Sequence, residues 1–156
     1  MQNDLLIGLQ YHQRGQLDEA ARIYQLLLDL DADNADALHL LGVLDHQRGE
    51  HRSGAERINR AIALNPGAAP YHANLAEVYR ALGRLDRAAA ACQTALGLRP
   101  EYPEAANNLG LVLLAQGQAD AAATWFREAL RLRPGVAMFH NNLGNALRLL
   151  GDLDRR

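Results

Sequence analysis

The apolar positions of this 156-residue chain follow helical spacing within a longer period of 34 residues. From 103 to 136 they form two stripes, each with apolar residues three or four positions apart, as on one face of a helix. A glycine separates the stripes and recurs in the earlier periods, at Gly15, Gly49, Gly83 and Gly117. A proline follows the second stripe of three periods, at Pro66, Pro100 and Pro134. Such a fixed period predicts a solenoid, whose units bury their apolar faces against their neighbours.

Each period predicts two helices, because the glycine suits a helix C-terminus and the proline a position just beyond one. The predicted helices are 2–14, 18–30, 35–48, 52–64, 69–82, 86–98, 103–116, 120–132 and 137–150. They group into four whole periods, 1–34, 35–68, 69–102 and 103–136, and a partial fifth, 137–156. We therefore expect residues 1–156 to form a single all-α array of antiparallel helix pairs, in which Gly151 makes a turn into a further helix near Asp154.

A small residue recurs inside the first helix of each pair, at Gly8, Gly42, Ala76, Gly110 and Gly144. Glycine inside a helix costs about 1 kcal/mol relative to alanine. Its recurrence at one position therefore indicates a packing requirement, and we expect the paired helices to approach each other closely there.

Charge and cysteine content restrict the partners and the compartment. The net charge is −2 without an acidic or basic block, so nucleic acid is not an expected partner, because phosphate binding needs clustered positive charge. Cys92 is the only cysteine, which rules out an intrachain disulfide and favours a reducing compartment. The sequence begins without a basic and apolar leader and has no apolar run of the roughly 20 residues that a membrane span needs. We expect a cytoplasmic protein that does not bind membranes.

Few side chains are placed for catalysis or for metal binding. Ser53, the only serine, lies next to the predicted turn between helices 35–48 and 52–64, and the chain has no lysine for a phosphate loop or a Schiff base. Cys92 lies in the apolar stripe of a predicted helix, where free cysteine is usually a buried packing residue. His46 and His51 flank a turn but lack the further ligands of a zinc site. We expect no catalytic residue, no metal and no cofactor.

The arrangement of residues within the period resembles the tetratricopeptide repeat, a 34-residue helix–turn–helix unit. The fourth period carries the matching residues Leu109, Gly110, Ala122, Phe126, Ala129 and Pro134, and the third carries Leu75, Ala76, Tyr79, Ala88, Ala95 and Pro100. The resemblance covers the whole chain. It implies a right-handed α-solenoid whose first helices line a concave groove, and it implies a protein or an extended peptide as the ligand of that groove.

Asparagines form the candidate site on these first helices. Asn74, Asn108 and Asn142 recur at one period, and Asn107, Asn141 and Asn145 lie beside them. A side-chain amide offers two donors and two acceptor lone pairs, which suits an extended peptide backbone of any sequence. Together with Glu77, these asparagines are the candidate peptide-binding residues. An alternative of equal weight is a hydrogen-bond ladder that links each repeat to the next, and both roles can coexist.

The asparagine series is similar to that of the repeats preceding the catalytic region of O-linked N-acetylglucosamine transferases, and of bacterial relatives fused to glycosyltransferase or sulfotransferase domains. That resemblance implies that Asn74, Asn108 and Asn142 grip the backbone of a substrate protein. The first two periods depart from the pattern, with Leu6 and Leu40 at the matching places, so a ladder is expected only from the third repeat onward. Two functions stay open: a peptide-binding scaffold, and the substrate-recruiting region of a larger transferase.

Two further expectations concern partners. The chaperone-binding repeats of this family hold a C-terminal carboxylate with cations on successive first helices, and no cation stands at the corresponding positions here, so such a clamp is not expected. Leu143, Leu147 and Leu150 form a stripe that a following helix would cover, but the sequence contains little beyond Asp154. Either the chain is a fragment of a longer array, or helix 137–150 buries this stripe against another molecule. An uncovered stripe favours association, so in both cases we expect the 156-residue chain to self-associate through helix 137–150.

Overall fold

The computed structural model describes residues 2–154, and the secondary structure of this range consists of helices alone. In chain order they are α1 (Gln2–Gln13), α2 (Leu17–Leu30), α3 (Ala35–Gln47), α4 (His51–Leu64), α5 (Ala69–Ala81), α6 (Leu85–Leu98), α7 (Pro103–Ala115), α8 (Ala119–Leu132) and α9 (Ala137–Asp154). The first eight begin and end within one residue of their predicted bounds. None of the described helices is long and apolar enough to cross a membrane.

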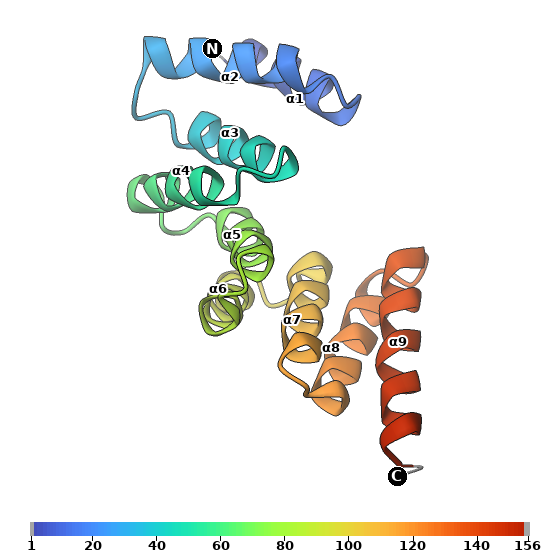
Figure 1. The fold of residues 1–156 in the computed structure, drawn as a ribbon. Helices are drawn as coiled ribbons and strands as arrows, with labels where there is room; N and C mark the ends of the chain where they lie inside the picture. Colours follow the sequence, from blue (N-terminus) through green and yellow to red (C-terminus); the bar gives the residue numbers. More distant parts are fainter. Residues whose placement is uncertain (1, 155–156) are drawn as a thin grey trace.

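The helices form consecutive antiparallel pairs, and each pair packs on the next (Figure 1). We call α1, α3, α5, α7 and α9 the first helices, and α2, α4, α6 and α8 the second helices. Within the described chain, successive first helices from α3 onward contact one another, whereas contacts between successive second helices are sparse or absent. The array therefore curves with its first helices on the inner side. The predicted all-α solenoid of helix pairs is confirmed.

Each pair turns at a glycine in the left-handed region of φ. At Gly117, for example, φ is +80°, and the next amide, Gln118 N–H, donates to the Leu113 carbonyl at 2.9 Å. A residue with a β-carbon would be strained there, whereas glycine is not. The same geometry recurs at the other three predicted turns, with φ of +76°, +84° and +74° at Gly15, Gly49 and Gly83.

The fifth glycine of the series behaves differently, and the predicted turn at this position is wrong. Gly151 lies inside α9, which continues to Asp154 instead of ending at 150. At the other four glycines a following helix packs back on the first and holds the turn in place. The part of the chain that the structure describes contains no such helix after Gly151, so the regular backbone hydrogen bonding of α9 continues through it.

The predicted packing role of the small residues is confirmed in three pairs. A β-carbon added to Gly110 would lie 2.6 Å from Cδ1 of Phe126, the fully buried aromatic of α8. At Gly8 and Gly42 it would meet the Tyr24 ring at 2.7 Å and Cγ1 of Ile58 at 2.8 Å. Contacts below about 3 Å are too close for carbon atoms, so each of these glycines makes room for a large side chain of the second helix.

Candidate functional site

Three asparagine amides connect successive first helices. Asn74 Nδ2 donates to His39 Nε2 at 2.8 Å, and Asn108 Nδ2 donates to the Ala73 carbonyl at 3.1 Å. Asn142 Nδ2 donates to Asn107 Oδ1 at 2.8 Å. The partners lie 35 positions apart in every case. The structure therefore contains the inter-repeat ladder that was one of the two alternatives for these residues.

Polar links at the same spacing also involve the first two repeats, where leucine and not asparagine stands at the ladder position, so the expected start of the ladder at the third repeat is wrong. His12 Nε2 is 2.6 Å from Gln47 Oε1 between α1 and α3, and the Tyr71 hydroxyl of α5 donates to Asp36 of α3. Both pairs have the same separation of 35 positions. Histidine, glutamine, tyrosine and aspartate thus replace asparagine in these links. A search at a spacing of 35 for any complementary polar pair could have found them.

Burial divides the seven candidate peptide-binding residues into three groups. Asn107 and Asn108 are only 2% and 5% exposed. Asn74, Glu77 and Asn142 are half-buried, and Asn141 and Asn145 are exposed. Peptide binding by these residues stays a prediction, and the exposed amides of α9 are the most accessible of them, although Asn145 Oδ1 accepts a hydrogen bond from Arg148 Nη2 at 3.0 Å.

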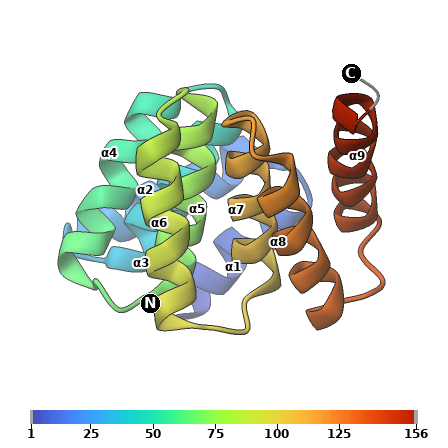
Figure 2. The same cartoon turned by 90° about the horizontal axis from the view of Figure 1, so that it is seen from below.

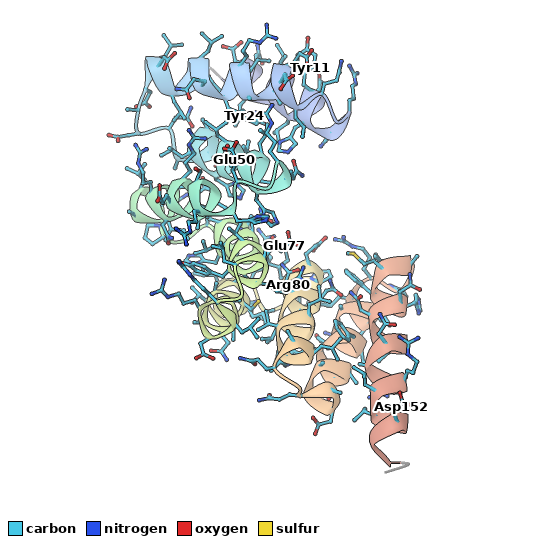
Figure 3. All side chains as sticks on the ribbon, viewed as in Figure 1. Tyr11, Tyr24, Glu50, Glu77, Arg80 and Asp152 are labelled. Carbon is cyan, nitrogen blue, oxygen red and sulfur yellow. The ribbon has the colours of Figure 1, made fainter. Side chains whose placement is uncertain are left out.

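Glu77 and Arg80 lie near the middle of the array. Figure 3 shows both on the side of α5 that faces the inner side of the curve. Burial raises the pKa of the Glu77 carboxyl, and the nearby Arg80 guanidinium opposes this shift. At neutral pH this part of the inner surface therefore presents one exposed cation and one half-buried acid.

Apolar residues occupy the positions equivalent to Glu77 in the other repeats as far as α7. One period from Glu77 stand Val43 and Leu111, and two periods before it stands Leu9; all three are half-buried, whereas two periods after it stands the exposed Asn145. The positions equivalent to Asn74 in the first two repeats are Leu6, which is 57% exposed, and half-buried Leu40. The inner side thus combines apolar side chains at its N-terminal end with amides at its C-terminal end.

His39 is the buried histidine of the ladder. Its side chain is 7% exposed, and its ring lies 4.4 Å from the Tyr71 ring, measured between centroids. Burial lowers the pKa of His39 to about 4; Asp36 opposes this shift and His12 reinforces it. His39 is therefore neutral at pH 7, and its Nε2 can accept the Asn74 hydrogen bond.

Cys92 and the His46–His51 pair are the groups whose reactivity or metal binding the structure allows to be assessed. Cys92 is fully buried, and burial raises the pKa of its thiol to about 12, so it is not a nucleophile at neutral pH. His46 Nδ1 and His51 Nδ1 are 2.8 Å apart at the α3–α4 turn. Within the described range, however, no three histidine, cysteine, aspartate or glutamate side chains are grouped as a metal site requires.

A second exposed apolar region lies outside the ladder. Between α1 and α2 there is a cleft of about 380 Å³. Its lining residues are Asp4, Ile7, Ile23, Leu26, Leu27, Asp29 and Leu30. Two carboxylates, Asp4 and Asp29, stand beside this apolar surface.

The structural part of the ladder can be measured by removing one amide. Asn108→Ala is expected to lower the free energy of unfolding by about 1 kcal/mol, because a buried hydrogen bond to the Ala73 carbonyl is lost. Urea denaturation followed by circular dichroism measures this value. Asn145→Ala is the control, since Asn145 is exposed on α9, and its effect should be near zero. Equal effects of the two substitutions would contradict a stabilising role for the buried amide.

Family comparisons match the period found in the sequence. The family described as "Tetratricopeptide repeat" matches residues 40–103, 74–137 and 109–155, and that described as "TPR repeat" matches residues 8–49. The first two matches begin 34 residues apart (74 − 40), which is the length of one period. A 63-residue segment of this chain is 38% identical in sequence to the Protein CTR9 homolog of Arabidopsis thaliana. The match covers 38% of this chain but only 6% of the length of that relative.

Solved structures share the fold over most of this chain. The crystal structure of MamA is 26% identical with a TM-score of 0.77, over 93% of this chain and 85% of that chain. PilF of Pseudomonas aeruginosa is 25% identical with a TM-score of 0.86, over 97% of this chain and 69% of that chain. A mutant O-GlcNAc transferase of Thermobaculum terrenum is 31% identical with a TM-score of 0.80, over 83% of this chain and 25% of that chain. With its period, its glycine turns and these matches, the chain belongs to the tetratricopeptide repeat family.

Proposed function

We propose that residues 1–156 act as one array that binds an extended segment of a partner protein along the inner side of its first helices, and that the array itself catalyses no reaction. The observation that carries this proposal is the set of polar and apolar side chains that packing leaves accessible on that side. Asn141 and Asn145 are exposed at one end, and Leu6 is 57% exposed at the other. An extended peptide can use both, because its backbone pairs with amides and its side chains with apolar surface.

The ladder supports this role by holding the surface rigid. Each polar link fixes the spacing between two first helices, so the groups that would meet a peptide are preorganised. Binding then costs less conformational entropy than it would on a flexible surface. The cytoplasmic location expected from the single cysteine stays a prediction.

The proposal is tested with peptides selected from a random, phage-displayed library against the 156-residue chain. Replacing both Asn141 and Asn145 with alanine is expected to weaken a selected peptide about 30-fold, because each amide contact contributes about 1 kcal/mol. Isothermal titration calorimetry measures the affinity. The matched control replaces Asn59 and Gln93, two exposed amides of second helices, with alanine and should leave the affinity unchanged. A peptide that is lost with the control but kept by the α9 variant would refute binding on the inner side.

A second function is favoured by the similarity to the O-GlcNAc transferase. That enzyme is 31% identical over 83% of this chain, which spans 25% of its length, and asparagines stand on the inner side here. In this alternative the array recruits substrate proteins for a glycosyltransferase or sulfotransferase region in a longer product. The mass of the full-length protein isolated from its native cells distinguishes the two. A mass near that of the 156-residue chain, 17.1 kDa, contradicts the recruiting alternative.

A further inference from the structure

A cleft lies on the outer side of the array, between the successive second helices α4 and α6. Both helices pack on α5, and Figure 2 shows them on the same side of it. Because α4 and α6 make few or no direct contacts with each other, they leave a space of about 360 Å³ beside the end of α5. We call it the α4–α6 cleft. Its charged and polar lining residues are Arg52, Arg84, Arg87, Glu56, Asn59 and Tyr79.

The cleft between α2 and α4, one repeat earlier, provides an internal comparison. Six of the eight residues that line the α4–α6 cleft stand 34 positions after a residue that lines this earlier cleft. In the earlier cleft, Arg48 pairs with Asp18 at 2.5 Å. Arg57 pairs with Asp45 at 2.6 Å, and only Arg22 among its charged lining residues has no ion pair in the described chain. The earlier cleft therefore neutralises most of its own charge.

The α4–α6 cleft lacks the two aspartates. Arg52 stands one period after Asp18 (52 − 18 = 34), and Tyr79 stands one period after Asp45 (79 − 45 = 34). Glu56 is the one carboxylate among the described lining residues, so three arginines and one glutamate give a net charge of +2. Within the described range none of these four charged side chains forms an ion pair. The cleft therefore holds a surplus of positive charge that the fold does not neutralise.

The arginines also stand at helix starts, where a cation is unfavourable. Arg52 is the second residue of α4, Arg84 directly precedes α6, and Arg87 lies in the first turn of α6. The positive end of a helix dipole favours an anion at these places. Asp86, the neighbouring acid on α6, accepts a hydrogen bond from Gln116 at 3.4 Å, beyond the end of α7. A bound anion in the α4–α6 cleft would be stabilised both by the guanidinium groups and by the two helix starts.

The Tyr79 hydroxyl adds a neutral donor to the cleft. Asn59 Nδ2 donates to this hydroxyl oxygen at 3.1 Å, which leaves the hydroxyl proton available for a ligand. The central carbon of the Arg87 guanidinium lies 6.0 Å from the centroid of the Tyr79 ring. Donors from α4, α5 and α6 thus surround the same space.

We propose that the α4–α6 cleft binds a phosphate monoester through the guanidinium groups of Arg52, Arg84 and Arg87 and the hydroxyl of Tyr79. A phosphate monoester carries a charge of about −1.5 to −2 at pH 7 and three strong acceptor oxygens. This charge matches the surplus of +2, and the three oxygens match donors that come from three helices. A carboxylate has one charge and two oxygens in a plane, and so satisfies the cleft less completely. The site is separate from the inner side of the first helices, so it does not depend on peptide binding there.

The test is a titration of the 156-residue chain, followed by the NMR signals of its backbone amides. The ligand is a short glycine peptide with one central phosphoserine, blocked at both ends. The signals of residues 52, 79, 84 and 87 are expected to shift and to saturate. The same peptide with glutamate in place of phosphoserine should bind about tenfold more weakly or worse, because it has less charge and fewer oxygens. Glycerol 3-phosphate distinguishes the source: equal affinity indicates that the phosphoryl group alone is recognised, and weaker affinity indicates a phosphorylated protein.

Two pairs of substitutions separate a specific site from a general effect of charge. Arg52→Gln combined with Arg87→Gln should keep the helicity, since both side chains are exposed, and should weaken the phosphoserine peptide about tenfold or more. The matched control combines Arg22→Gln with Arg127→Gln, which removes the same charge from exposed positions of other second helices, and should leave the affinity unchanged.

Three results overturn the proposal. They are a wild type that does not bind the phosphoserine peptide, a glutamate peptide that binds as tightly, and an equal loss of affinity in the two double variants. None of them affects the proposed binding on the inner side, which is tested with different residues and different peptides.

Discussion

Phe126→Ala is expected to lower the free energy of unfolding by about 4 kcal/mol, the largest effect of any single substitution considered for this chain. The Phe126 ring is fully buried and packs among Ala122, Ala123 and Ala146, so it joins α8 to α9 as well as to α7. Alanine neighbours cannot move inward far enough to fill the space, because their side chains are single methyl groups. Urea denaturation, with helicity followed by circular dichroism, measures the loss.

Gly110 provides the control for this explanation. Gly110→Ala in the wild type should cost about 2 kcal/mol, because the added methyl group overlaps the Phe126 ring. In the Phe126→Ala background the same change should cost nothing and should even stabilise α7 by up to about 1 kcal/mol, the usual gain from replacing glycine within a helix. Additive effects of the two substitutions would contradict a direct contact between the ring and Gly110.

The helices up to Leu132 were predictable because their boundaries depend on local signals that recur with the period. Gly117 ends α7 through its own backbone conformation, and Pro134 cannot continue α8. The end of α9 was not predictable in this way. Gly151 has the same sequence position as the turn glycines, but a glycine only permits a turn, and a packed second helix is what holds it.

The candidate site was predictable in part. The recurrence of Asn74, Asn108 and Asn142 correctly indicated contacts between neighbouring first helices. The partners were missed because a helical side chain points back toward the N-terminus of its helix, so each amide reaches a residue 35 positions earlier instead of 34. The burial of Asn107 depends on the packing of three helices and is not visible in any local pattern. His39 was missed for the same reason.

Acidification is expected to destabilise the fold through His39. Its pKa in the folded chain is about 4, below the ordinary value of 6.5, because burial disfavours the charged ring. Between pH 6.5 and about 4 the unfolded chain therefore binds a proton at His39 that the folded chain does not. The free energy of unfolding should fall by about 3 kcal/mol from this residue as the pH decreases across that window, and the residue adds no pH dependence above it.

His39→Gln isolates this contribution, because glutamine does not titrate but can still accept a hydrogen bond from Asn74. Other groups alter the total curve: burial lowers the pKa of His46 and acts in the same direction, whereas it raises the pKa values of Asp45 and Glu77, which act in the opposite direction. The quantity to measure is therefore the difference in unfolding free energy between wild type and His39→Gln, by urea denaturation from pH 7 to pH 4. As the pH falls from 7 to 4, the unfolding free energy of the wild type should decrease by about 3 kcal/mol relative to that of His39→Gln. If the difference stays constant with pH, His39 is not the neutral acceptor that links α3 to α5.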